Sequence, residues 1–341
     1  MMLADLLQRL RPARPAPDSP GADRPKVELE FGVLSVDGAS VAEALPAALP
    51  LPVGPVYDES RRERMLKGLD LRAGRGAEIG PLHNPLVSKA DGDVLYLDHC
   101  DTETLRSIWS KDASVDVSKL HVDVVWRSRT LVEALKTHGD GALAGGSLDY
   151  VVASHVVEHV PDLIGWLNQI QEALKPDGQL RLAVPDRRFT FDYLRQDTTL
   201  ADVLAAHLAD ARVPSAACIL DHTLNMVQVD CAAAWRGEID AASLKTVYQF
   251  DYCVSTARDA LANGTYHDFH CWVFTPASFV NLMMAMGSHD LHHFSCVDFY
   301  DTPRNDFEFV VHLTPCADRE ERVESWKRAL GRTRQYAFAR D

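Results

Sequence analysis

The chain has 341 residues, of which 46% are apolar and 25% are charged, and it carries a formal net charge of −14 at pH 7. This length is enough to bury one large hydrophobic core or two smaller ones. A surface this acidic repels phosphate backbones and anionic lipid headgroups, so nucleic acid is not expected as the main partner. The longest apolar runs are far shorter than the about 20 residues that a membrane-spanning helix needs, so no membrane span is expected.

Seven cysteines are scattered along the chain and never form a Cys-x-x-Cys pair. Neither a disulfide framework nor a zinc ribbon is therefore indicated, and a reducing cytoplasm is the expected location. The first ten residues hold a leucine cluster that Asp5 interrupts, and no small-residue cleavage pattern follows it. This composition is a poor match to a secretory signal.

Residues 1–60 are expected to form an N-terminal extension, part of it flexible. The segment 11–25 is rich in Pro, Arg, Ala and Asp, and it has too few apolar side chains to offset the entropy of ordering. Residues 27–36 alternate apolar and polar side chains in places, which favours a small strand pair. Prolines punctuate 45–55 and exclude regular structure there.

A repeating strand and helix pattern occupies residues 61–188, after a charged stretch at 61–69. A helix is expected within 160–174, followed by a tight turn at 175–178. Strands that alternate with helices imply crossover connections and a parallel sheet. The expected strands of this pattern lie at 77–79, 94–97, 122–126, 148–153 and 179–184.

Residues 189–275 are mostly helical in pattern and are expected to form an inserted lid. The segment 276–315 then predicts a closing helix over 276–286 and two strands over 291–300 and 307–313. A short turn joins these two strands, so they are expected to pair antiparallel. Residues 316–341 are expected to be a C-terminal tail.

Ligands of open parallel sheets bind beyond the carboxyl ends of the strands, so the residues that follow each strand are the first candidates. The first strand leads into Glu78 and Gly80, where a glycine lets the backbone pass close to a ligand and a carboxylate accepts a hydrogen bond. The second strand ends at Asp98, whose carboxylate can hold both hydroxyls of a ribose. The fourth strand ends in Ser154 and His155.

Four segments resemble, in order and spacing, the successive motifs of class I S-adenosylmethionine-dependent methyltransferases: Ala77-Glu78-Ile79-Gly80, Leu97-Asp98-His99, 148–160 and 174–186. The resemblance covers about residues 61–185. It implies a Rossmann-like, doubly wound seven-stranded sheet, mostly parallel with an antiparallel last strand, plus the helical insertion. Within this class, the segment 78–85 is similar to methyltransferase domains of bacterial surface-polysaccharide biosynthesis. The first loop departs from the family, because prolines stand where spaced glycines are usual.

The resemblance implies S-adenosylmethionine as the cofactor. Glu78 would bind the methionine amine, Asp98 would hold the ribose, and His99 would flank the adenine. The residue after the third strand, Asp123 or Trp126, would line the adenine pocket. The residues expected at the cofactor are Glu78, Gly80, Pro81, Asp98, His99, Ser154 and His155.

The implied reaction is methyl transfer to an oxygen of a sugar or glycan-type acceptor, and removal of the hydroxyl proton requires a base that titrates near neutrality. The candidates for this base are His155, Asp186, His267 and His270. The last two lie in His267-Asp268-Phe269-His270. This segment is either a substrate-binding or base-supplying loop, or a loop whose histidines only bond the backbone.

Glu158 and His159 are expected to be an acid at a helix start and a capping or packing imidazole. No metal is expected, because magnesium prefers oxygen-rich clusters over a set such as His267, Asp268 and His270. A nicotinamide oxidoreductase is poorly supported, since Gly74-Arg75-Gly76 precedes the first strand instead of following it. The alternative function is a non-catalytic methyltransferase-fold binding protein or scaffold, which the proline-filled first loop favours.

Overall fold

The computed structural model describes residues 54–126, 130–138 and 145–333, together with the backbone of three short strands nearer the N-terminus. The chain divides into two compact units, residues 1–50 and 51–341. In the first unit, β1 (Val27–Glu30) pairs antiparallel with β2 (Val33–Val36), as the alternation over this segment predicts. A third strand, β3 (Ala39–Ser40), pairs with β2. The predicted flexible arm at 11–25 lies outside the described residues.

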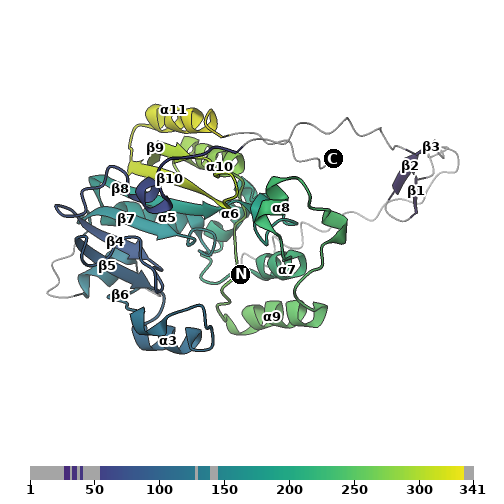
Figure 1. The fold of residues 1–341 in the computed structure, drawn as a ribbon, viewed down its shortest axis with the longest axis horizontal. Helices are drawn as coiled ribbons and strands as arrows, with labels where there is room; N and C mark the ends of the chain where they lie inside the picture. The colour runs from purple at the N-terminus through teal and green to yellow at the C-terminus, as the bar shows by residue number, and fades with distance from the viewer. Residues whose placement is uncertain are drawn as a thin grey trace, which may run out of the picture. The chain divides into compact units, whose positions relative to one another are not determined.

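The second unit is built on a seven-stranded sheet with the order β6-β5-β4-β7-β8-β10-β9 (Figure 1). The first five of these strands are parallel, and β10 runs antiparallel between β8 and β9. The predicted Rossmann-like sheet with an antiparallel last strand is therefore confirmed. Strand order reverses between β4 and β7, where ligands bind in such sheets. The strands are β4 (Arg75–Ile79), β5 (Asp93–Asp98), β6 (Val124–Val125), β7 (Leu148–Ser154), β8 (Leu174–Pro185), β9 (Phe294–Tyr300) and β10 (Glu308–Pro315).

Separate hydrophobic clusters cover the two faces of the sheet. On one face, side chains such as Leu97 and Leu182 pack with five helices. On the other face, Tyr96 and Ala183 pack with α2 (Arg61–Leu66). Adjacent residues of one strand thus enter opposite clusters, as the two-residue repeat of a strand requires. The five helices of the first face are α4 (Leu131–Lys136), α5 (Leu163–Ala173), α6 (Leu200–Leu208), α10 (Pro276–Ser288) and α11 (Arg319–Leu330).

The connection from β4 to β5 contains no helix, so the alternation of strands and helices fails at its first crossover. Pro81 and Pro85 remove two backbone donors from this loop. The loop instead makes a turn in which the Asn84 N–H donates to the Pro81 carbonyl at 3.2 Å. The first helix after these strands, α3 (Thr102–Trp109), follows β5.

The tight turn predicted at 175–178 is wrong, because β8 begins at Leu174 and includes these residues. Leu148 of β7 pairs with Leu174 while Tyr150 pairs with Gln179, so the four residues bulge out within the ladder. Gly178 fits this bulge because a Cβ there would lie only 3.0 Å from the Leu148 carbonyl oxygen.

The segment between β8 and α10 contains four α-helices, and Figure 1 shows α7, α8 and α9 grouped to one side of the sheet. Phe269 packs with α7 and α9, and Trp235 of α8 stacks on Phe189 with ring centroids 4.1 Å apart. None of the described helices is long and apolar enough to cross a membrane. The four helices of the segment are α6 (Leu200–Leu208), α7 (Ala216–Asn225), α8 (Cys231–Trp235) and α9 (Phe250–Asn263).

The segment predicted to be a C-terminal tail contains helix α11, which belongs to the core. Trp326 of α11 is fully buried and donates its indole N–H to the Phe294 carbonyl at 3.0 Å. Phe279 of α10 lies edge-on to the same ring, with centroids 6.3 Å apart. The sequence of α11 is rich in charged residues, which hides the single large apolar side chain that anchors it.

Replacing Trp326 with Ala is expected to lower the free energy of unfolding by about 3–5 kcal/mol, because it leaves a cavity where a buried indole stood. Lys327→Ala, at an exposed position of the same helix, should change it by less than about 0.5 kcal/mol. Urea unfolding followed by circular dichroism measures both variants. Small and equal effects would show that α11 does not contribute to the core.

Candidate active site

Glu78, near the end of β4, is buried and anchors the loop that follows the strand. Its Oε1 accepts a hydrogen bond from the Leu86 N–H at 2.8 Å, and its Oε2 accepts one from the Val87 N–H at 2.9 Å. Burial raises the pKa of this carboxyl, and the two hydrogen bonds offset part of the rise. Because both oxygens hold backbone amides, Glu78 shapes the first loop. Its predicted contact with the methionine amine stays a prediction.

Gly80 directs the chain from β4 into this loop. Its φ of +61° lies in the left-handed region that glycine adopts without strain. A Cβ on Gly80 would lie 3.5 Å from the Cγ2 of Val156, in the turn after β7. The loop backbone therefore passes close to the end of β7, at the position where strand order reverses.

Asp98 and His99 lie at the carboxyl end of β5. Asp98 Oδ1 accepts from the His99 backbone N–H at 2.7 Å, and among the described residues Oδ2 has no hydrogen-bond partner. Of the two adenine candidates, Trp126 lies beside this site, since its backbone N–H donates to the Asp98 carbonyl at 2.8 Å. The carboxylate of Asp123 is already used by Lys89, Tyr96 and His121.

His155, directly after β7, is held in an ion-pair network. Its Nε2 lies 2.7 Å from Oε2 of Glu308, the first residue of β10. Arg61, at the start of α2, donates to both oxygens of Glu308 at 2.6 and 2.9 Å and to the Ser154 Oγ at 2.6 Å. His155 adopts a φ of +53°, which non-glycine residues rarely do, so the network fixes a strained backbone.

The network keeps His155 protonated at neutral pH. Burial alone would lower the pKa of His155, but the carboxylates of Glu158 and Glu308 outweigh burial and raise it to about 9. Burial would likewise raise the pKa of Glu308, yet His155 and Arg61 hold it at about 2. A protonated imidazole has no free lone pair, so His155 does not fit the predicted role of catalytic base.

Glu158 lies in the turn after β7 and is fully buried. Among the described residues, neither of its carboxylate oxygens has a hydrogen-bond partner. Three imidazoles lie around its Oε1: His155 Nδ1 at 3.5 Å, and the Nε2 atoms of His159 and His270 at 4.0 Å each. Burial would raise the pKa of this carboxyl, but the three rings outweigh it and lower the pKa. We call Glu158, His159 and His270 the Glu158 centre.

The expectation that Glu158 is an acid at a helix start is wrong. Helix α5 begins at Leu163, and Asp162 is its N-cap, with its side chain accepting from the Gly165 N–H. Glu158 lies in the preceding turn, buried among imidazoles, where a carboxylate is costly unless something compensates its charge.

His270 reaches the centre from the end of the helical insertion. Its Nδ1 lies 2.5 Å from Oδ2 of Asp192, and the other oxygen of Asp192 accepts from Arg195 Nη1 at 2.8 Å. Burial would raise the pKa of Asp192, but His270 and Arg195 hold it at about 2. A carboxylate on Nδ1 fixes the orientation and tautomer of the ring, so the Nε2 of His270 is directed at Glu158.

Backbone hydrogen bonds clamp the segment that carries His270 to the turn that carries Glu158. The N–H groups of Cys271 and Trp272 donate to the Glu158 carbonyl at 2.6 and 3.1 Å. The Trp272 indole N–H donates to the Val160 carbonyl at 2.7 Å. The side chains of the centre are therefore positioned by two segments that are tied together directly.

His159, Asp268 and Tyr266 connect the Glu158 centre to the end of β5. His159 Nδ1 lies 2.9 Å from Asp268 Oδ1, and the Tyr266 hydroxyl donates to the same oxygen at 3.0 Å. The Tyr266 ring lies 5.9 Å from the ring of His99, which neighbours Asp98. The Asp268 side chain is 62% exposed, so this polar path is open to solvent.

Two of the four predicted bases lie outside the Glu158 centre for clear reasons. Asp186 is fully buried, and its oxygens accept from Arg188 Nη2 at 2.6 Å and Thr302 Oγ1 at 2.7 Å. His267 Nε2 lies 3.0 Å from Oδ2 of Asp259 in α9. With His155 protonated, His270 is the predicted base that the structure brings into the centre.

Four residues of the site were not predicted from the sequence: Arg61, Asp192, Arg195 and Glu308. They come from α2, from the insertion and from β10, and no local motif joins them. Arg61 and Glu308 are 247 positions apart. The one usable signal was Glu158-His159, an acid and an imidazole placed soon after a buried strand.

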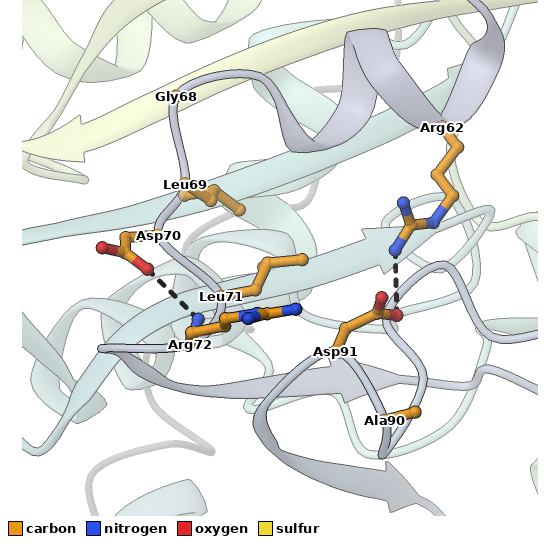
Figure 2. A pocket seen from close by; sticks show the side chains of 8 residues that line it. All are labelled: Arg62, Gly68, Leu69, Asp70, Leu71, Arg72, Ala90 and Asp91. Atoms are coloured by element: carbon orange, nitrogen blue, oxygen red, sulfur yellow. Dashed lines mark hydrogen bonds and ion pairs between the residues drawn. The ribbon is translucent and has the colours of Figure 1, made fainter.

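The surface cavity in Figure 2 lies at the amino ends of the parallel strands, opposite the carboxyl ends that carry the site. It is lined by residues 68–72, which precede β4, by Ala90 and Asp91, which precede β5, and by Arg62. An ion pair of 2.9 Å joins Arg62 to Asp91 (Figure 2). Residues before parallel strands lie at their amino ends, so this cavity is not part of the site at the carboxyl ends.

The sequence profile of a methyltransferase domain matches residues 89–293, and the chain belongs to this family. No curated protein matches the chain.

Three solved structures are similar to this chain at low sequence identity. A putative Zn-dependent alcohol dehydrogenase from Rhodobacter sphaeroides is 12% identical, over 78% of this chain and 92% of that chain, with a TM-score of 0.40. An S-adenosylmethionine-dependent methyltransferase from Mesorhizobium loti is 13% identical, over 74% of this chain and 97% of that chain, with a TM-score of 0.35. A putative S-adenosylmethionine-dependent methyltransferase from Listeria monocytogenes is 14% identical, over 74% of this chain and 95% of that chain, with a TM-score of 0.35. At these identities and TM-scores, none of the three structures supports a conclusion about the activity or the acceptor of this chain.

The family confirms S-adenosylmethionine as the cofactor that the motifs imply. The residues at the carboxyl ends of β4 and β5 fit this molecule. Asp98 leaves Oδ2 available for a ribose hydroxyl, and Gly80 brings the backbone of the first loop close to the end of β7. Both features stand at the reversal of strand order, where this fold binds its ligands.

Replacing Glu308 with Gln is expected to lower the pKa of His155 from about 9, because it removes one of the two carboxylates that raise it. The raised pKa adds stability that is complete below about pH 6.5 and is lost as the pH rises through about 9. As the pH rises over this interval, the unfolding free energy of the Glu308 variant should therefore fall less steeply than that of the unaltered protein.

NMR titration of the His155 ring measures this pKa, and urea unfolding at each pH measures the stability. Glu103→Gln, an exposed position on α3, should leave both curves unchanged. An unshifted His155 in the Glu308 variant would contradict the assigned network.

Proposed function

We propose that the protein transfers a methyl group from S-adenosylmethionine to a hydroxyl oxygen of a sugar or glycan-type acceptor. The observation that carries the proposal is the polar path from Asp98 and His99 through Tyr266 and Asp268 to the Glu158 centre. Imidazole, carboxylate and phenol groups bond hydroxyls well. A polyhydroxylated acceptor suits this lining better than an apolar one does.

Residues at the strand ends hold the cofactor in this proposal. When bound, S-adenosylmethionine supplies an electrophilic methyl group on a sulfonium. Asp98 holds the ribose through its free Oδ2, and Trp126 lines the adenine pocket beside it. Glu78 shapes the first loop by binding its amides, while Gly80 lets that loop pass over the end of β7.

The proton of the acceptor hydroxyl is removed through His270. Asp192 occupies the Nδ1 of this ring, so the Nε2 that faces Glu158 is the atom able to accept a proton. Asp192 acts through His270 and is a positioning residue. The insertion supplies both side chains, and in this proposal it forms the lid over the acceptor.

The expected setting is bacterial surface-polysaccharide biosynthesis in the cytoplasm. Its support is the resemblance of the segment 78–85 to methyltransferases of that process, together with the seven cysteines, all of which are free in the structure.

His270→Ala is expected to lower kcat by about 10²–10⁴-fold, the usual contribution of a positioned base. The affinity for S-adenosylhomocysteine should stay unchanged, because His270 lies on the acceptor side. Transfer of a labelled methyl group to a panel of sugars, nucleotide sugars and oligosaccharides measures kcat.

The control is His289→Ala, an exposed histidine at the end of α10, which should keep full activity. Full activity of the His270 variant would remove His270 from the mechanism. Cofactor binding without methylation of any acceptor in the panel would favour the non-catalytic scaffold instead.

A further inference from the structure

We propose that Glu158, His159 and His270 bind a divalent transition-metal ion, for which Zn²⁺ is the suitable probe. One ligand atom from each residue lies within 4.8 Å of the other two. Two imidazole nitrogens and one carboxylate oxygen are a ligand set that zinc and related ions use, and it leaves coordination positions open.

A buried carboxylate without a hydrogen bond is the observation that points to an ion at this position. Glu158 is fully buried, and among the described residues neither of its oxygens has a hydrogen-bond partner. The nearest ring nitrogen, His155 Nδ1, lies 3.5 Å away, and the Nε2 of that ring is already paired with Glu308. A carboxylate in such surroundings is costly unless a cation compensates it, and an ion between Glu158 and the two rings would do so.

Each proposed histidine ligand has a carboxylate behind it. His270 Nδ1 forms a hydrogen bond of 2.5 Å with Asp192 Oδ2, whereas His159 Nδ1 lies 2.9 Å from Asp268 Oδ1 as an ion pair without hydrogen-bond geometry. Metal-binding histidines usually have such a partner on the ring nitrogen that does not bind the ion, because it fixes the tautomer and the ring orientation. Both Nε2 atoms consequently approach the same oxygen of Glu158 at 4.0 Å.

The surroundings of the centre tolerate a cation. Glu158 and the groups on its two histidines supply three carboxylates, Glu158, Asp192 and Asp268, and among the described residues Arg195, on Asp192, is the one Lys or Arg side chain paired with them. A tetrahedral zinc site with bonds of 2.0–2.1 Å places ligand atoms about 3.3 Å apart, so the nitrogens would move toward Glu158 by about 0.7 Å. The backbone clamp between Glu158 and residues 271–272 keeps the two segments in place during that movement.

Two other ligand sets are weaker. Asp98, His99 and Cys100 also bring suitable atoms together, but Asp98 Oδ1 already accepts from His99, and the set holds no buried polar group without a partner. His267, considered in the sequence analysis, is paired with Asp259 of α9.

An ion at the Glu158 centre would change how the acceptor loses its proton. It would occupy the Nε2 of His270, and a hydroxyl bound at its open position would have a lower pKa. The O–H bond would then break with release of the proton to solvent, while the bonding pair stays on the acceptor oxygen. This consequence rests on the proposed function, whereas ion binding itself does not.

The test is a titration of the full-length protein, freed of metal by a chelator, with Zn²⁺ against a chromophoric chelator. We expect one ion per chain with a Kd below about 1 μM. Glu158→Gln, which keeps the shape of the side chain, should weaken binding by more than 100-fold. Asp192→Asn should weaken it by about 10–100-fold, as loss of a partner behind a ligand does. The matched control His267→Ala should bind zinc as the unaltered chain does.

Thermal unfolding of the same samples separates loss of the site from loss of the fold. Zn²⁺ should raise the Tm of the unaltered protein and of His267→Ala but not that of Glu158→Gln, which should unfold cooperatively without metal. Mg²⁺ at the same concentration should give no rise. Absence of zinc binding, or equal zinc binding by Glu158→Gln, would overturn the inference. The affinity of the unaltered protein for S-adenosylhomocysteine is measured in parallel. A protein that binds zinc but does not bind S-adenosylhomocysteine would contradict the proposed function alone.

Discussion

The charge of the buried Glu158 carboxylate is the constraint on which the rest of the site depends. Three imidazoles lie 3.5–4.0 Å from its Oε1. Each of these rings has a second carboxylate on its other side, supplied by Glu308, Asp268 or Asp192. Imidazoles and carboxylates therefore alternate outward from Glu158, and removal of one ring leaves a carboxylate with one polar neighbour fewer.

The sheet explains why these groups meet. The turn after β7 carries Glu158 at the position where strand order reverses, and β10 places Glu308 beside it because its first residue pairs with the last residue of β8, Pro185. The insertion joins them through Asp192 and His270, and its end is fastened to the Glu158 carbonyl. The cofactor side and the acceptor side are thus both built at the carboxyl edge, whereas the surface cavity of Figure 2 lies at the amino edge.

Local sequence patterns were sufficient for the parts of the fold that depend on short-range periodicity. Strands at 77–79, 94–97 and 148–153 and the motifs that follow them were predicted correctly, because buried strands are short apolar runs that end at turn residues. The helix-free crossover after β4, the bulge at 175–178 and α11 were not predicted. They depend on hydrogen bonds and packing between distant segments, such as the contact of Trp326 with Phe279.

The same contrast between short-range patterns and long-range contacts applies to the site. Asp98 was found because it directly follows a strand, and His270 because two histidines and an acid lie close together in the sequence. Asp186 was also predicted because it directly follows a strand. Its carboxylate is already hydrogen-bonded, however, and one of the donors is Thr302, 116 positions away. The protonation of His155 depends on Glu308, 153 positions away. Side-chain chemistry is readable from sequence, whereas the partners that decide its state come from the tertiary structure.

The central claim is that the carboxyl edge of β4 and β5 binds S-adenosylmethionine next to the Glu158 centre. Calorimetric titration with S-adenosylhomocysteine tests it most directly, on the unaltered protein, on Asp98→Ala, and on Asp112→Ala as an exposed acidic control. The account predicts micromolar binding that Asp98→Ala weakens at least tenfold, about 1.4 kcal/mol, and that Asp112→Ala leaves unchanged. Absence of binding, or equal binding by the three proteins, would contradict it.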